Sequence, residues 1–214
     1  MDAFDTLPES FYHQDPHDLA RALLGHDLVR SLADGTLLRA RIVELEVYGG
    51  IFDAASHSSS GEPTERTEAM FGEPGTIYVY RSYGIHHCMN VVAPAGERPA
   101  ALLVRAVRPL QGHHRMAVLR GLDDRYDRDM TNSVARNLGS GPGKLCEALA
   151  VDLSYNFEPL YAGDLRLVRG LDDDERAALS IERTPRIGLN PDTVGDAVDW
   201  EWRYVVADSD YLSR

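Results

Sequence analysis

The sequence is poor in features that would place it in several common protein classes. It has two cysteines, and neither Cys88 nor Cys146 belongs to a CxxC motif. This count excludes a Cys-rich zinc site and favours two reduced, buried thiols. No apolar run reaches the roughly 18 residues of a membrane span. The acidic N-terminus lacks the basic and apolar regions of a signal peptide. We therefore expect a cytoplasmic protein that makes no membrane contact.

Positive charge is also scarce, and lysine occurs only once, as Lys144. The formal net charge is -12, from 34 acidic and 22 basic residues. This balance argues against nucleic-acid binding, because phosphate contacts need clustered Lys and Arg. The distribution of charge leaves room for a locally basic face, since residues 97–120 hold one acid and five arginines. These are Arg98, Arg105, Arg108, Arg115 and Arg120.

Capping and turn signals predict one α+β domain. Asp15 and Pro16 predict the start of a helix that Gly25 ends. Asp34-Gly35 lies between two alternating segments, residues 27–32 and 36–48, and predicts a β-hairpin. We expect a long loop over 49–76, strands over 76–80, 86–92, 101–107, 165–168 and 202–206, a helix over 109–122, irregular chain over 123–137, and a glycine-rich turn opening a helix at 144–149.

The second strand of the predicted hairpin carries two carboxylates. Its period of two places Ile42, Glu44, Glu46 and Tyr48 on one face, and Val43, Leu45 and Val47 on the core face. A carboxylate beside an aromatic ring can act as a general base. The pattern alone favours the alternative, that both acids face solvent.

Aromatic residues gather over a short stretch of the sequence. Flat amphipathic rings suit a site that stacks a nucleobase, but strand propensity alone also enriches aromatics. Both readings stay open. The cluster consists of Tyr48, Tyr78, Tyr80 and Tyr83, with His57, His86 and His87 nearby.

The segment Gly139-Ser-Gly-Pro-Gly143 precedes Lys144 and predicts exposed backbone N–H groups at a helix start. Such groups bind phosphate, so Gly141, Gly143 and Lys144 are candidates for contact with a DNA phosphate. The spacing is not that of a nucleotide-triphosphate loop, because Leu145 stands where Ser or Thr is needed. No GxSxG or HExxH motif occurs. We expect no metal and no cofactor, and a lysine-based mechanism could use only Lys144.

Many spaced segments together resemble the alkyladenine (3-methyladenine) DNA glycosylase family. The resemblance covers roughly residues 8–206. The segments are 19–25 (LARALLG), 41–48 (RIVELEVY), 53–58, 70–71, 74–80 (PGTIYVY), 83–84, 88–90 (CMN), 102–106 (LLVRA), 141–146 (GPGKLC) and 186–188 (RIG).

The resemblance implies a role for each matching residue. Glu46 matches the general base that polarises water, and Arg105 matches an arginine near that water and the flipped nucleotide's phosphate. Tyr83 matches the side chain that wedges into the duplex, with the apolar Ile85 beside it. The residues that match the base-binding pocket are Tyr48, His57, Tyr80 and Asn90.

The resemblance implies an α+β fold: a curved antiparallel sheet flanked by helices, with a protruding hairpin that inserts into DNA. We expect one domain over residues 1–214, with about seven N-terminal and eight C-terminal residues at its periphery. The implied function is that of a monomeric glycosylase that flips alkylated purines from double-stranded DNA and hydrolyses their bond to the sugar. Hypoxanthine and ethenoadenine are further candidate substrates, and the enzyme would associate with a bacterial nucleoid. The alternatives are a non-catalytic binder of damaged DNA and a nucleoside hydrolase.

Overall fold

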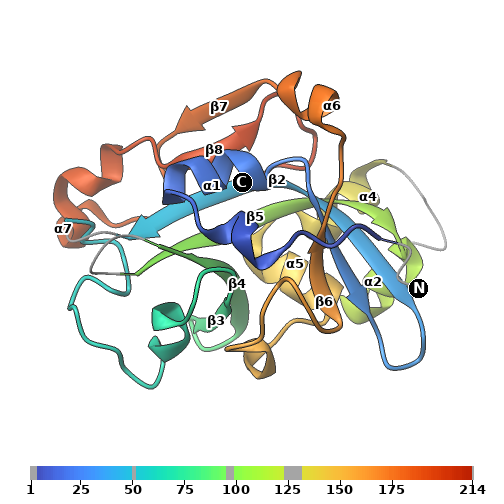
Figure 1. Ribbon diagram of the computed structural model, residues 1–214, viewed down its shortest axis with the longest axis horizontal. Coiled ribbons are helices and arrows are strands. Elements are labelled where there is room, and N and C mark those ends of the chain that lie inside the picture. Colours follow the sequence, from blue (N-terminus) through green and yellow to red (C-terminus); the bar gives the residue numbers. More distant parts are fainter. Residues whose placement is uncertain (1–3, 50–51, 95–98, 123–131, 214) are drawn as a thin grey trace.

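The computed structural model describes residues 4–49, 52–94, 99–122 and 132–213, together an α+β domain (Figure 1). Arg98 lies outside these ranges. The strands are β1 (Asp27–Ser31), β2 (Leu37–Gly49), β3 (Ile77–Ser82), β4 (His86–Ala93), β5 (Ala100–Gln111), β6 (Leu165–Val168), β7 (Ile181–Thr184) and β8 (Arg203–Val206). The helices are α1 (Pro16–Leu23), α2 (His113–Leu119), α4 (Asn132–Gly139), α5 (Pro142–Leu149), α6 (Asp173–Ala177) and α7 (Pro191–Val194), with short 3-10 turns at Glu9–Tyr12, Glu68–Phe71, Leu153–Tyr155 and Gly195–Asp199.

The eight strands of the described residues join one antiparallel sheet in which β2 is the central element. The strand order is β3-β4-β5-β2-β1-β6, and β8 also pairs with β2 and with β7. One edge of β2 pairs with β5 over most of its length. The other edge pairs first with β1, at residues 37–41, and then with β8, at residues 44–46. The segment with the two glutamates therefore lies where β2 exchanges one neighbour for another.

Two irregularities in the pairing of β2 with β5 change which side chains share a face. The register skips Val43 on β2 and Arg105 on β5. Such a bulge adds a residue to one strand and re-aims the side chains that follow. Ile42 consequently joins the main hydrophobic core with Leu45 and Val47. The prediction that Ile42 shares the face of Glu44 and Glu46 was therefore wrong. The common face of Glu44, Glu46 and Tyr48 is confirmed, because Tyr48 donates to Glu46 and Arg105 donates to both carboxylates.

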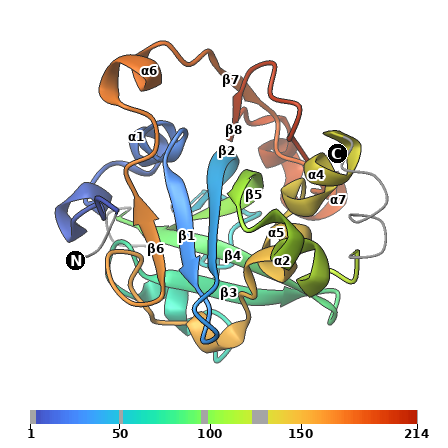
Figure 2. The ribbon, with the colours of Figure 1, turned by 90° about the vertical axis from the view of Figure 1, so that its right-hand side faces the viewer.

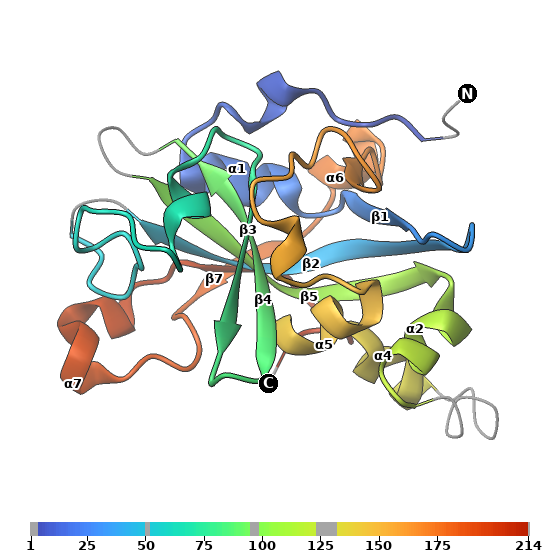
Figure 3. The same cartoon turned by 90° about the horizontal axis from the view of Figure 1, so that it is seen from below.

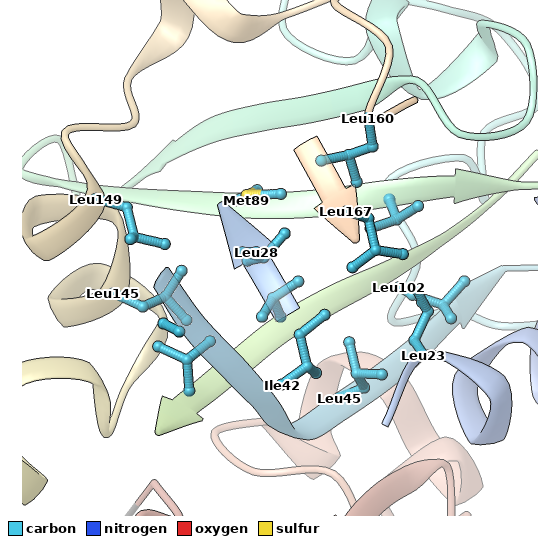
Figure 4. Packing of buried hydrophobic residues seen from close by; sticks show 14 of the residues in the cluster. Leu23, Leu28, Ile42, Leu45, Met89, Leu102, Leu145, Leu149, Leu160 and Leu167 are labelled. Carbon is cyan, nitrogen blue, oxygen red and sulfur yellow. The ribbon is translucent and has the colours of Figure 1, made fainter. Parts of the chain in front are cut away.

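The main core lies within the curve of the sheet. Figure 4 shows leucines of β1, β5 and β6 with Ile42 and Leu45 of β2 pointing into one space. Leu23 of α1 enters from one side and Leu145 and Leu149 of α5 from the other. Figure 2 shows α2, α4 and α5 together on one side of the strands, with α1 and α6 on the other. These helices cover the sheet as the predicted fold class requires.

The predicted segments on either side of α2 differ most from the structure. Residues 109–111 belong to β5 rather than to a helix, because that strand continues to pair with β2. Pro109, which has no N–H to donate, is tolerated there beside a register shift. Gly112, at φ 82°, then turns the chain into α2. Part of the segment predicted to be irregular forms α4, and residues 123–131 lie outside the described ranges.

The helix and hairpin signals were more reliable. The Asp15 carboxylate accepts a hydrogen bond from His17 N at 2.9 Å and caps α1. Strands β1 and β2 pair antiparallel on either side of Asp34-Gly35. Cys88 and Cys146 are both free and buried, as predicted. Within the described ranges, no helix is long and apolar enough to cross a membrane.

Candidate active site

A pocket of about 330 Å³ opens between the β3–β4 hairpin, the polar face of β2 and β5, and the segment that follows β7. A volume of this size is at the lower end for small-molecule sites. Aromatic and apolar groups line most of it. The lining residues include Tyr48, His57, Tyr78, Tyr80, Tyr83, Cys88, Asn90, Arg105, Pro142, Ile187 and Leu189.

Glu46 lies directly behind one wall of this pocket and is fully buried. Its Oε2 accepts hydrogen bonds from Tyr48 Oη at 2.8 Å and Arg105 Nη1 at 3.0 Å. Its Oε1 accepts one from the backbone N–H of Ile187 at 2.6 Å. All three donors belong to residues that line the pocket. The carboxylate is thus held in one orientation, and the alternative that it faces solvent is wrong.

Glu44, two residues earlier, is also fully buried and belongs to the same charged cluster. Its Oε1 accepts hydrogen bonds from Arg105 Nε at 3.0 Å and Arg203 Nε at 2.7 Å. Arg105 thereby bridges the two carboxylates, and it lies at the bulge in β5. Burial lowers the pKa of Arg105, but Glu46 and Glu44 outweigh burial and raise that pKa overall. The guanidinium is a fixed positive charge.

The opposite wall is aromatic, and its rings are uncharged. His57 Nδ1 lies 2.7 Å from Tyr78 Oη, and the ring of His57 meets that of Tyr80 edge-on, with centroids 4.6 Å apart. Burial, with a smaller effect of Arg66, lowers the pKa of His57 to about 4. Burial also raises the pKa of Tyr78 and of Tyr80. At neutral pH this wall therefore carries an uncharged imidazole and two uncharged phenols.

Asn90 fixes the floor between these walls. Its side-chain amide donates to the backbone oxygens of Tyr78, at 2.9 Å, and Cys88, at 3.2 Å. Burial raises the pKa of Cys88, so its sulfur lines the pocket as a neutral thiol. The structure brings together all four residues predicted to bind a base, since Tyr48, His57, Tyr80 and Asn90 line one pocket.

A buried ion pair joins the two walls. Arg186 donates to both carboxylate oxygens of Asp53, at 2.7 and 2.9 Å, and to the backbone oxygen of Val47 at 3.0 Å. Its guanidinium carbon lies 4.6 Å from the centre of the Tyr48 ring. Asp53 begins the loop that carries His57, and its carboxylate also accepts from the N–H of Gly49 at 3.0 Å. Arg186 therefore sets the position of Tyr48 and of this loop at once.

The rim of the pocket bears the most exposed aromatic side chain of the described residues. Tyr83 is 93% exposed and Ile85 72%, at the tip of the hairpin between β3 and β4 (Figure 3). Tyr83 and Gly84 have φ of 50° and 72°, the combination of a type I′ turn. Ile85 N donates to Ser82 O at 3.1 Å and closes the turn. The backbone thus holds a large apolar ring out in solvent.

A second cleft, of about 790 Å³, adjoins the pocket and shares Tyr83, Cys88 and Pro142 with it. Gly141 caps α5 and Pro142 is its first residue, so Gly143 and Lys144 lie in the first helical turn rather than in a preceding loop. Lys144 Nζ donates to Asn137 Oδ1 at 2.6 Å. The three predicted phosphate-binding residues line this cleft together.

The described arginines of residues 97–120 do not form one basic face. Arg105 is buried at the pocket, whereas Arg115 pairs with Asp34 at 3.2 Å and Arg120 with Glu147 at 3.2 Å. Sequence reasoning considered Glu44 only as a possible general base beside Glu46, and it assigned no role to Asp53, Arg186 or Ser213. Those residues act through contacts between distant segments, which spacing along the chain does not reveal. Among the described residues, no group of three or more His, Cys, Asp or Glu is arranged to hold a metal ion.

Comparison with known proteins gives a consistent result. A family model described as methylpurine-DNA glycosylase (MPG) matches residues 10–210. A protein of Desulfitobacterium hafniense is 40% identical over 207 residues, and one of Clostridium botulinum is 37% identical over 209 residues. Each alignment covers 97% of this chain and 98% of the relative. Both relatives carry the name "Putative 3-methyladenine DNA glycosylase".

Proposed function

This chain belongs to the methylpurine-DNA glycosylase family and is a DNA repair glycosylase, and we propose that it removes 3-methyladenine and related damaged purines from duplex DNA with Glu46 as general base. The observation that carries the proposal is the pocket itself. An aromatic cage sized for a small planar ligand opens directly onto the groups that hold a buried carboxylate.

The hydrogen bonds of Glu46 leave one acceptor position of its carboxylate for a water molecule. An ionised carboxylate has about four lone-pair positions, and Tyr48, Arg105 and Ile187 use three of them. The remaining position is on Oε1. A water bound there would give its proton to Glu46 as its oxygen attacks C1′ of the deoxyribose. The electron pair of the N-glycosidic bond leaves with the purine.

The uncharged rings of the pocket suit a cationic leaving group. Purines alkylated on ring nitrogens, such as 3-methyladenine, carry positive charge in DNA and leave the sugar as neutral bases. Uncharged Tyr48, His57 and Tyr80 would stack on such a base through their π-faces without repelling it. Asn90, fixed in the floor, would exclude bases whose edge carries an additional group there. Hypoxanthine and ethenoadenine remain further candidate substrates.

Access to the pocket requires that the nucleotide leave the base stack, at a cost of a few kcal/mol. Tyr83 and Ile85 would enter the space that the base vacates, since both project from the hairpin at the pocket rim. The first turn of α5, at Gly141, Gly143 and Lys144, would bind a neighbouring phosphate through backbone N–H groups and one ammonium.

The direct test is release of free base from duplex DNA treated with a radiolabelled methylating agent, with chromatography to identify the base. We expect wild-type protein to release 3-methyladenine and Glu46→Gln to be slower by about 100- to 10,000-fold. Glu182→Gln, an exposed glutamate on β7, is the matched control and should act like wild type. Binding of methylated DNA without release of any base would instead support the damaged-DNA binder, and turnover of free nucleosides alone would support a nucleoside hydrolase.

A further inference from the structure

The charged cluster behind the pocket includes one more residue, supplied by the last described segment of the chain. Ser213 lies far in sequence from Glu44 and Arg105 but is buried against both. Its Oγ lies 2.6 Å from Glu44 Oε1, 3.1 Å from Arg105 Nε and 3.0 Å from Arg105 Nη2. Its backbone N–H donates to Glu44 Oε2 at 2.6 Å.

Elementary hydrogen-bond chemistry fixes the direction of these contacts. A guanidinium has only donors and an ionised carboxylate only acceptors. The single Ser213 hydroxyl proton must therefore point to Glu44, while the lone pairs of Oγ accept from Arg105. Ser213 thus connects the carboxylate and the guanidinium in one closed ring.

This ring determines how Arg105 meets the general base. Arg105 presents Nε to Glu44, Nε and Nη2 to Ser213, and Nη1 to Glu46. Three of its contacts are thus on the side away from Glu46. Arg203 holds Glu44 in place from β8 and itself donates to Thr184 Oγ1 at 3.0 Å. The planar guanidinium cannot rotate about its long side chain while these contacts persist.

We propose that Ser213 and Glu44 are positioning residues that form a clamp on Arg105 and hold its Nη1 against the catalytic carboxylate of Glu46. This inference rests on the proposed function for its kinetic consequence, but the clamp is a physical arrangement that can be measured without activity. The segment of residues 207–213 thereby supports the catalytic carboxylate without lining the base pocket, whereas its Asp210, Leu212 and Ser213 line the adjoining cleft.

The first measurement reports on the clamp alone. In ¹⁵N-labelled wild-type protein, the Arg105 Nε–H should give a resonance that exchanges slowly with water, because it is buried and bonded twice. Arg105→Lys assigns that resonance by its loss. Ser213→Ala should accelerate its exchange at least about tenfold, because a charge-assisted bond of this kind contributes about that factor or more. An unchanged exchange rate in Ser213→Ala would overturn the clamp.

The second measurement separates chemistry from binding. With enzyme in excess, Ser213→Ala should release 3-methyladenine from methylated DNA about tenfold more slowly than wild type. Its Kd for a duplex with a tetrahydrofuran abasic-site analogue should not change. Ser213→Thr retains a hydroxyl and should restore most of the rate, and Ser209→Ala, in the same segment, should match wild type.

The outcomes distinguish the two proposals. Wild-type protein that shows the protected Arg105 signal but releases no base would refute the proposed function and leave the clamp standing. Active protein in which Ser213→Ala releases base at the wild-type rate would refute the positioning role. A loss of DNA affinity in Ser213→Ala, with the single-turnover rate preserved, would also refute it, since the segment would then serve binding.

Discussion

The two walls of the pocket differ in how they treat charge. The wall formed by β2 and β5 concentrates buried glutamates and arginines that compensate one another. The wall formed by β3 and the loop that follows β2 consists of uncharged rings, and burial lowers the pKa of its histidine to about 4. The exposed Arg66 lies outside them, over the Tyr80 ring at 5.3 Å from its centre. We infer that the two walls have different roles. Fixed charges orient a reactive carboxylate, while neutral rings can stack on a cationic ligand.

The largest effect is expected where the walls are joined. Arg186→Met should destabilise the protein by about 3 to 5 kcal/mol, because it leaves the buried carboxylate of Asp53 without its charged partner. Urea unfolding followed by circular dichroism measures this free energy. Arg169→Met removes an exposed arginine paired with Asp5 and should cost less than about 1 kcal/mol. Equal effects of the two substitutions would mean that the junction does not hold the walls together.

Because burial keeps His57 uncharged, we predict that the free energy of unfolding depends on pH. The folded-state pKa of His57 is about 4, below its ordinary value near 6.5. Between these values the unfolded chain binds more protons at this residue, so stability rises with pH through this window and is fully present above it. His57→Gln should remove about 2 kcal/mol of the stability difference between pH 7 and pH 5.

Urea unfolding of both proteins at the two pH values gives this difference directly. Burial also lowers the pKa of His26, to about 3, but His26 is present in both proteins and its contribution cancels. Identical pH dependences would show that His57 is not kept neutral by the fold, and the contrast between the walls would lose its electrostatic basis.

The rim of the pocket differs from both walls, because the residue that follows β3, Tyr83, exposes its aromatic ring to solvent. Tyr83→Ala should lower single-turnover excision about tenfold for a lesion in a matched pair and less for a mismatched lesion, which is easier to extrude. Phe157→Ala removes an exposed aromatic beside the other end of β3 and should leave both rates unchanged. Equal losses on matched and mismatched lesions would contradict a role of Tyr83 in extrusion.

The smallest effect is expected for the single lysine. Lys144→Gln should weaken DNA binding a few-fold, equally for damaged and undamaged duplexes, because a phosphate contact carries no information about the base. The slope of log Kd against log salt concentration should fall by about 0.9 if one phosphate contact is lost. Fluorescence anisotropy at several salt concentrations measures the slope, and an unchanged slope would place the phosphate elsewhere.

Local signals predicted much of the fold. Asp15 and Pro16 specify a helix start, and Asp34-Gly35 specifies a turn, through contacts that span only a few residues. The alternation over residues 44–48 correctly placed Glu44, Glu46 and Tyr48 together. It failed at Ile42 because a bulge shifts the register at Val43, and a bulge depends on the partner strand. The helix predicted from Pro109 failed for the same reason, since pairing with β2 prolongs β5.

The sequence by itself determined the family, the candidate base and the aromatic residues of the cage, because these residues lie in compact motifs along the chain. Only the tertiary structure decided that Glu44 and Glu46 are buried rather than exposed, that Arg186 joins Tyr48 to Asp53, and that Ser213 closes a ring with Arg105. Each of these depends on segments more than 50 residues apart meeting at the polar face of β2. The environment that fixes a buried charge is assembled by folding, so no local pattern can specify it.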